Sequence, residues 1–260
     1  MDSNYEYRGM MAQFWDLLRG DTSQWEDRFF YLDVIQESGQ PVLDVGCGTG
    51  RLLIDYLSQG IDIDGVDNSP EMLALCAQKA AAINRQASLY QQSMQALSLP
   101  RRYQTILVPS SSFQLLITPE QAQTAMQRFY AHLLPGGVLV MPFMLIWSGE
   151  SDQPVITEEF SREVTRPQDG AIIRRRSISH YEQATQLEST EDIYEVILDG
   201  VIIASEKHSR SPATRGYRQE QALSLYREAG FSDIRLLSGF TFEPAKADDF
   251  VFTLIGKRPF

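Results

Sequence analysis

The residues best suited to chemistry in this sequence lie in and after a glycine-rich stretch, Val42-Leu43-Asp44-Val45-Gly46-Cys47-Gly48-Thr49-Gly50-Arg51. Glycine adopts positive φ at little steric cost, and its missing side chain lets a ligand lie against the backbone. A helix that begins after such a turn presents unpaired N–H groups to an anionic group. Asp67 follows Gly50 by 17 residues, where a carboxylate accepts hydrogen bonds from the hydroxyls of a ribose. This spacing indicates a site for a cofactor that contains a nucleoside.

Two kinds of cofactor use this geometry. Nicotinamide-dependent dehydrogenases favour G-x-G-x-x-G, in which the third glycine allows close packing of the helix. Arg51 occupies that third position here, so the dehydrogenase pattern fails where it is most diagnostic. A turn that binds no ligand is the remaining structural alternative.

The elements that must position these residues alternate between short apolar strands and amphipathic helices. Helices are predicted within 1–40 and over 51–58, 69–82 and 119–134, and strands over 41–45, 61–66, 87–90, 105–108 and 138–143. Pro135-Gly136-Gly137 is expected to end the helix before it. The order predicts an α/β fold with a doubly wound, mainly parallel, seven-stranded Rossmann-like sheet, and ligands at the carboxyl ends of its strands.

The periodicity changes from helical to alternating between residues 150 and 214. Segments 155–164, 171–181, 186–198 and 201–210 are predicted to be antiparallel strands, and Asp199-Gly200 is typical of a hairpin turn. A helix over 219–229 and strands over 231–237 and 250–256 complete the chain. We expect one domain over residues 1–260, in which 150–214 form an antiparallel β subdomain inserted after the fifth strand as a cap or an interface.

Four stretches resemble motifs of class I S-adenosylmethionine-dependent methyltransferases. VLDVGCGTGR resembles the first motif of that family and GVDNSPEML the second, while LLPGGVLVMPF and AGFSDIRLL are similar to its later strands. The resemblance spans about residues 10–258 and implies S-adenosyl-L-methionine as the cofactor. It implies that Asp44 and the three glycines hold the methionine portion, that Asp67 takes the ribose hydroxyls, and that Asn68 and Met72 flank the adenine.

Ser93 marks a departure from the family, which often has an acidic residue at this place to contact the adenine amino group. A serine still accepts a hydrogen bond. The full predicted cofactor site comprises Asp44, Gly46, Cys47, Gly48, Gly50, Arg51, Asp67, Asn68, Met72, Ser93, Met94 and Ser110.

The stretch after the fourth predicted strand, Pro109–Phe113, faces the acceptor in the resembling family. It lacks the Asn/Asp-Pro-Pro-aromatic motif of enzymes that methylate nucleobase amines, and it supplies no acidic metal ligands. Cys47 and Cys76 lie in the cofactor loop and on the second helix of the Rossmann-like part, so we expect neither to act as a nucleophile. The serines at 110–112 form either a polar turn or a contact to cofactor or acceptor.

Ser-Ser-Phe at this place, Trp15-Asp16 and the antiparallel insertion are together similar to small-molecule methyltransferases that act on amino sugars and glycine-like amines. Trp15, Phe113 and His180 are the predicted acceptor-binding residues, although Trp15 could equally anchor the core. No metal site and no general base are predicted. His132 is expected to be structural and His208 exposed, and a solvated face is favoured over an anion site for Arg174–Arg176.

The sequence therefore predicts an S-adenosylmethionine-dependent methyltransferase that acts on a small molecule. A neutral amine needs no strong base, which favours nitrogen. The alternatives are an O-methyltransferase of a small metabolite and a non-catalytic protein that binds the cofactor. The net charge of -11 argues against nucleic acid as a partner, and no apolar run reaches the length of a membrane helix. Two cysteines and the absence of a signal-peptide pattern favour the cytoplasm, and a homodimer is possible.

Overall fold

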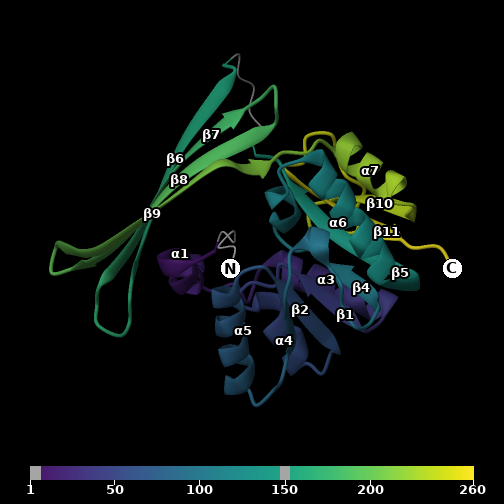
Figure 1. Cartoon of the computed structure of the whole chain (residues 1–260), viewed down its shortest axis with the longest axis horizontal. Helices are drawn as coiled ribbons and strands as arrows, with labels where there is room; N and C mark the ends of the chain where they lie inside the picture. Colours follow the sequence, from purple (N-terminus) through teal and green to yellow (C-terminus); the bar gives the residue numbers. More distant parts are fainter. Residues whose placement is uncertain (1–6, 147–152) are drawn as a thin grey trace. The chain divides into compact units, whose positions relative to one another are not determined.

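The computed structural model describes residues 7–146 and 153–260, so residues 150–152 of the predicted insertion lie outside the described part. The chain divides into two compact units (Figure 1). One combines Met1–Thr22 with Ile146–Gly216, and the other combines Ser23–Leu145 with Tyr217–Phe260. Among the helices described, none has the length and apolarity needed to cross a membrane.

The larger unit contains the predicted seven-stranded sheet. Its strands are β1 (Val42–Val45), β2 (Ile63–Asp67), β3 (Ser88–Gln91), β4 (Tyr103–Leu107), β5 (Leu133–Met144), β10 (Ser232–Ser238) and β11 (Val251–Lys257). They lie in the order β10-β11-β5-β4-β1-β2-β3. β11 runs antiparallel to both of its neighbours, and the strands from β5 to β3 are parallel. The doubly wound, mainly parallel fold is thus confirmed.

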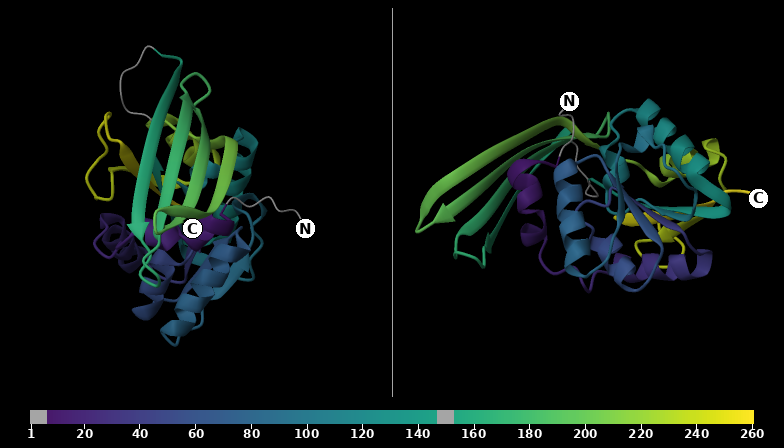
Figure 2. Two further views of the ribbon diagram at one scale, coloured as in Figure 1. Left: turned by 90° about the vertical axis from the view of Figure 1, so that its left-hand side faces the viewer. Right: turned by 60° about the horizontal axis from the view of Figure 1, so that its bottom comes forward.

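Helices cover both faces of this sheet (Figure 2). α3 (Glu26–Ser38), α4 (Arg51–Ser58) and α5 (Pro70–Ala82) pack on one face, and α6 (Pro119–His132) and α7 (Gln219–Glu228) on the other. Neighbouring residues of a strand serve opposite cores because side chains alternate along it: Val42 joins the α3–α5 core and Leu43 the α6–α7 core. As predicted, Ser69 caps α5 by accepting a hydrogen bond from the Met72 N–H.

One predicted boundary is wrong. The helix over 119–134 ends at His132, and Pro135-Gly136-Gly137 lies inside β5 rather than in a turn before it. Tyr103 of β4 pairs with Leu133, yet Thr105 pairs with Val138, so the ladder shifts its register across the Pro-Gly-Gly segment. Gly136 supplies the positive φ of 77° within this bulge.

The smaller unit is an antiparallel sheet with two short helices against it. β6 (Val155–Thr165), β7 (Ile172–Glu182), β8 (Leu187–Leu198) and β9 (Val201–Arg215) follow one another in space as in sequence. Asp199 and Gly200 both have positive φ, as the predicted hairpin turn requires. β9 extends five residues beyond the predicted end of its strand at 210.

The N-terminal helices of this unit were not predicted to join the insertion. α1 (Gly9–Gln13), α2 (Trp15–Arg19) and the residue between them contribute Met11, Leu18 and Phe14 to a core that they share with Ile173 and Tyr194 of the sheet. This packing gives the sheet a buried apolar face that 65 inserted residues alone would bury poorly.

Candidate cofactor site

The glycine loop lies where the strand order reverses. β1 has β2 on one side and β4 on the other, and open α/β sheets bind ligands at such a point. The N–H groups of Gly46 and Cys47 both donate to the carbonyl of Val66, at 2.8 and 3.1 Å. Gly46, Gly48 and Gly50 all have positive φ, of 72°, 54° and 84°. The loop is thus a tight turn held to the end of β2, and glycine is required by its backbone.

Asp67 ties this loop to the start of α5. Its Oδ2 accepts the Gly48 N–H at 2.9 Å, and its Oδ1 accepts the Ser69 N–H at 2.9 Å. Burial raises the pKa of Asp67, and the hydrogen bonds from Ser69, Gly48 and Asn68 partly offset that rise. A carboxylate oxygen accepts more than one hydrogen bond, so the fixed Asp67 retains acceptor sites for a diol.

Asp44 is a buried carboxyl in the middle of this arrangement. It is 2% exposed, and its Oδ1 has no hydrogen-bond partner within the described chain. Desolvation raises the pKa of Asp44 to about 7; Arg51 lowers it, while Asp67 and Asp27 raise it further. A buried polar atom left without a partner is costly. A ligand donor, above all an ammonium group, would supply both the hydrogen bond and the opposite charge.

The three glycines have different surroundings. A Cβ on Gly50 would lie 2.6 Å from Cys76 Sγ, and one on Gly46 would lie 2.8 Å from Ser112 Oγ. A Cβ on Gly48 would meet no atom within 4 Å among residues 7–146 and 153–260. Gly46 and Gly50 therefore allow close packing, and Gly48 faces open space beside the two carboxylates. The unpaired Asp44 oxygen, the open side of Gly48 and the fixed Asp67 together suit the amino-acid and ribose portions of S-adenosylmethionine.

Ser112 lies against the glycine loop, a contact that was not predicted from the sequence. It begins η2 (Ser112–Leu115), the short helix that follows β4. Gln114 fixes η2 to β5, since its side chain donates to the Met144 carbonyl at 3.0 Å and accepts the Met144 N–H at 2.9 Å. The run of serines at 110–112 was the available signal, but it does not reveal which serine approaches Gly46.

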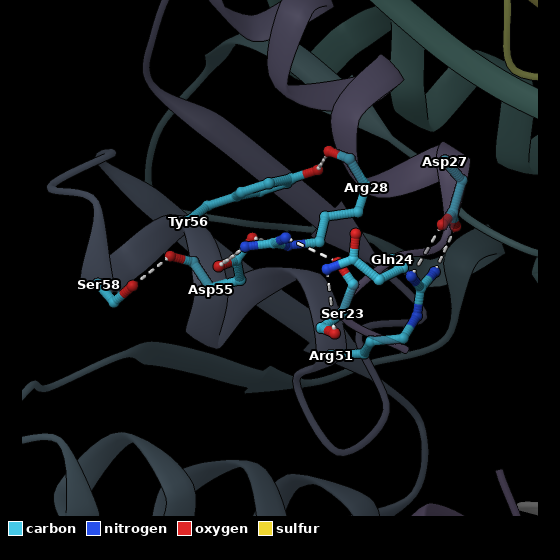
Figure 3. Close-up of polar contacts among 8 residues, drawn as sticks. All are labelled: Ser23, Gln24, Asp27, Arg28, Arg51, Asp55, Tyr56 and Ser58. Carbon is cyan, nitrogen blue, oxygen red and sulfur yellow. Dashed lines mark hydrogen bonds and ion pairs between the residues drawn. The ribbon is translucent and has the colours of Figure 1, made fainter. Parts of the chain in front are cut away.

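Arg51, at the start of α4, is engaged by α3 (Figure 3). Its guanidinium donates two hydrogen bonds to the Asp27 carboxylate, at 2.9 and 2.5 Å, and lies over the Trp25 ring. Arg28 and Asp55 make a second two-pronged ion pair between the same helices. These contacts fix α4, the helix that follows the glycine loop, to α3. A contact from Arg51 to the cofactor stays a prediction.

The remaining predicted cofactor residues follow the other parallel strands. Asn68 is exposed after β2, and Met72 is buried in the first turn of α5. Ser93 and Met94 lie at η1 (Met94–Ala96) after β3, and Ser110 has a positive φ of 57° after β4. The carboxyl ends of parallel strands share one edge of the sheet. The structure therefore gathers these residues at the edge that carries the glycine loop.

Cys47 has the surroundings of a structural cysteine. It is 6% exposed, and a hydrogen bond with Cys76, followed by burial, raises the pKa of its thiol well above the usual value. Because the thiolate is the nucleophilic form, this environment supports the prediction that Cys47 does not attack a substrate.

The predicted acceptor residues fall in different places. Phe113 is fully buried and packs against Phe129, Phe143 and Tyr217. The structure thus places it in the core of the larger unit, without exposed surface for a ligand. Its place after β4 suggested an outward direction, but η2 turns the side chain inward.

Trp15 and His180 belong to the smaller unit. Trp15 is half-buried between Tyr7, whose ring lies 4.9 Å away, and the Arg19 guanidinium. His180 is exposed, with Nδ1 2.9 Å from Thr157 Oγ1. Contact of either residue with an acceptor stays a prediction.

The expectation that His208 is exposed is wrong. β9 extends past residue 210, so His208 lies within the strand, 8% exposed, with its ring edge-on to Tyr194. His132 has the predicted structural role, since Leu99 N–H donates to its Nε2 and its Nδ1 lies 2.7 Å from the Arg128 carbonyl.

The three consecutive arginines of β7 all have acidic partners. Arg174 and Arg176 pair with Glu195, and Arg175 pairs with Asp192 on the other face of the sheet. This alternation agrees with the predicted strand, and the partner carboxylates disfavour an anion site.

Residues 42–137 match a protein family described as a methyltransferase domain. The chain is 30% identical over 141 residues to dTDP-3-amino-3,6-dideoxy-alpha-D-glucopyranose N,N-dimethyltransferase of Streptomyces fradiae, a match that covers 52% of this chain and 54% of that protein. It is 26% identical over 144 residues to glycine/sarcosine N-methyltransferase of Halorhodospira halochloris, covering 52% of each chain. The chain spans about half the length of these curated relatives.

Solved structures share the fold over nearly the whole chain. An S-adenosylmethionine-dependent methyltransferase from Clostridium acetobutylicum superposes with a TM-score of 0.76 at 18% identity, covering 96% of this chain and 98% of its own. DesVI of Streptomyces venezuelae superposes with a TM-score of 0.72 at 23% identity, covering 98% and 100%. At these identities the likeness establishes the fold.

Proposed function

We propose that this chain is a class I S-adenosylmethionine-dependent methyltransferase that transfers a methyl group to an amino nitrogen of a small molecule. The observation that carries the proposal is the constellation of Asp44, Gly48 and Asp67, with one carboxylate oxygen unpaired, one glycine open and one carboxylate fixed. S-adenosylmethionine, when bound, supplies an electrophilic methyl group. The protein's own task is then to orient the acceptor in line with it, which contributes about 7–11 kcal/mol through proximity.

Nitrogen is favoured over oxygen by two observations. Two relatives, at 30% and 26% identity, are named as an N,N-dimethyltransferase and an N-methyltransferase. In the larger unit, both ring nitrogens of His132 are already engaged by backbone groups, so this histidine is not available as a base for a hydroxyl acceptor. A neutral amine carries its own lone pair and needs no such base.

Calorimetry tests the cofactor assignment directly. We expect S-adenosylmethionine and its demethylated product to bind, and NAD to bind more weakly than either. Asp67→Ala should weaken binding by about 1.5–3 kcal/mol, the usual cost of losing hydrogen bonds to a charged group. Asp62→Ala is the matched control, because Asp62 precedes β2 and its carboxylate pairs with Arg101. NAD binding as tight as that of the methionine cofactor would refute the assignment. Mass-spectrometric assay of amine and hydroxyl acceptors then separates N- from O-methylation.

We also propose that the inserted sheet acts as a cap during the reaction. A cap excludes water and holds an acceptor in line, which catalysis by positioning requires. Hydrogen exchange with the demethylated product and an acceptor is expected to increase protection in β7, β8 and β9 as well as in residues 46–50. Protection confined to residues 46–50 would show that the insertion is a surface embellishment.

A further inference from the structure

The antiparallel sheet of the smaller unit has two edges of different character. Among the described residues, β6 pairs only with β7 and β9 only with β8, so these two strands form the edges. An edge strand presents a row of backbone N–H and C=O groups that have no partner in the sheet. Such an edge therefore pairs with a further strand unless its sequence or its geometry blocks the approach.

β9 has features that block its edge. Pro212 lies within the strand and has no N–H to donate to a further strand. The ladder between β9 and β8 shifts its register twice, at Ile203 and over residues 211–213 of β9. Because such irregularities bend and twist an edge strand, they disfavour regular pairing along it.

β6 is a regular edge over its whole length. It pairs with β7 residue for residue from Val155 to Thr165, and its sequence contains no proline. All of its residues except Ile156 and Val164 are exposed. An exposed and regular edge of 11 residues can add a further strand through its backbone hydrogen bonds. The open edge of this sheet is therefore β6.

The side chains of β6 select a second copy of the same strand as the partner. Antiparallel pairing of two copies about Phe160 would place Glu158 opposite Arg162 of the partner subunit, once on each side of the two-fold axis. Phe160 would lie opposite its own counterpart. Opposite charges and aromatic pairs placed directly across two strands stabilise a sheet. The strand is thus complementary to itself in this register.

The two neighbouring registers lack this complementarity. Pairing about residue 159 would place Glu159 opposite its own counterpart. Pairing about residue 161 would place Glu159 opposite Glu163 of the partner subunit. Like charges directly opposite each other destabilise a strand pair, so the charges favour the register about Phe160.

The side chains that this register needs are accessible. Phe160 is 51% exposed, and Glu158 and Arg162 are exposed as well. Within residues 7–146 and 153–260, neither Glu158 nor Arg162 forms an ion pair, whereas Glu163 pairs with Arg174. The two charges can therefore pair across the edge without breaking an ion pair of the sheet.

We propose that two copies of this chain associate edge to edge through β6, antiparallel about Phe160, so that their antiparallel sheets become one continuous sheet. Backbone hydrogen bonds along β6 provide the affinity, and the Glu158–Arg162 pairs fix the register. This association does not depend on the proposed reaction, because it involves only the outer edge of the inserted sheet.

Sedimentation equilibrium of the full chain over a range of concentrations tests the pairing. We expect a reversible dimer. Glu158→Arg or Arg162→Glu alone would set like charges opposite each other twice, and each should weaken the dimer about tenfold or more. The variant that carries both substitutions restores opposite charges and should dimerise within about threefold of the native chain. A fold damaged by one substitution would not be repaired by adding the other.

Glu159→Arg is the matched control. It changes the net charge by the same amount on the same strand, but residue 159 lies on the other face and opposite Ser161 of the partner subunit. It should leave dimerisation unchanged. Hydrogen exchange of the native chain should show protection of β6 that rises with protein concentration, and protection of β9 that does not.

Three results would each overturn the proposal. The first is a native chain that stays monomeric at every concentration, as expected if the edge binds a strand of another protein. The second is a dimer that neither single charge reversal weakens, which would place the contact elsewhere. The third is a double variant that dimerises no better than the single variants.

Discussion

Replacing Asp44 by asparagine is expected to make the cofactor-free protein more stable at neutral pH. Burial raises the pKa of Asp44 from 3.8 to about 7, so the folded protein binds a proton that the unfolded chain has released over that interval. The ionisation of this carboxyl therefore costs no stability below pH 4, costs increasingly more as pH rises, and costs most above pH 7. Asparagine does not titrate. The free energy of unfolding of Asp44→Asn should therefore exceed that of the native protein by an amount that grows between pH 4 and 7 and levels off at about 2–4 kcal/mol.

The same replacement is expected to weaken the binding of S-adenosylmethionine by roughly 10- to 100-fold at pH 8, or about 1.4–2.7 kcal/mol. The ionised Asp44 would face the ammonium group of the cofactor, and asparagine loses that charge. Below pH 7 the native carboxyl takes up a proton, so the two proteins should converge in affinity. Urea unfolding and calorimetry at pH 5, 6, 7 and 8 measure both effects.

Asp64→Asn provides the contrast for Asp44→Asn. Asp64 is equally buried, but its carboxylate accepts hydrogen bonds from Arg101 and Tyr103. Its replacement should therefore destabilise the fold by about 1–3 kcal/mol and leave cofactor affinity unchanged. Loss of stability in Asp44→Asn, or affinity equal to that of the native protein at pH 8, would contradict the role given to Asp44.

Gly48→Ala is expected to reduce cofactor affinity by about 100-fold, or about 2.7 kcal/mol, while costing only about 1–2 kcal/mol of stability. The new methyl group meets no atom of the described residues within 4 Å, so the only cost to the fold is that of placing alanine at φ 54°. A cofactor lying against the loop would meet that methyl group directly. Calorimetry gives the affinity, and urea unfolding gives the stability.

Gly60→Ala is the matched control for this substitution. Gly60 also has a positive φ, of 83°, and open space around its Cβ position, but it follows α4 and lies outside the loop. It should lose similar stability and keep full affinity. Equal affinities for the two variants would mean that the open side of Gly48 is not where the cofactor lies.

The sequence by itself determined the fold class and the position of the glycine loop. Both depend on local patterns: the alternation of apolar strands and amphipathic helices, glycines at positions of positive φ, and an acidic residue after the next strand. The antiparallel insertion was predictable for the same reason, since alternation of period two and an Asp-Gly turn are local signals. The Pro-Gly-Gly segment was predicted wrongly because the same residue types occur in a bulge within a strand and in a turn that precedes a strand.

The tertiary structure alone decided which partners these residues have. Arg51 meets Asp27 of an earlier helix, Ser112 approaches Gly46, and Phe113 turns into the core. Each contact joins segments far apart in the chain, and residue type and spacing do not encode such a contact. The unpaired oxygen of Asp44 likewise depends on what surrounds it after folding. So does the burial of Asp192 and His208 in one sheet, because burial is a property of the packed molecule and not of the strand.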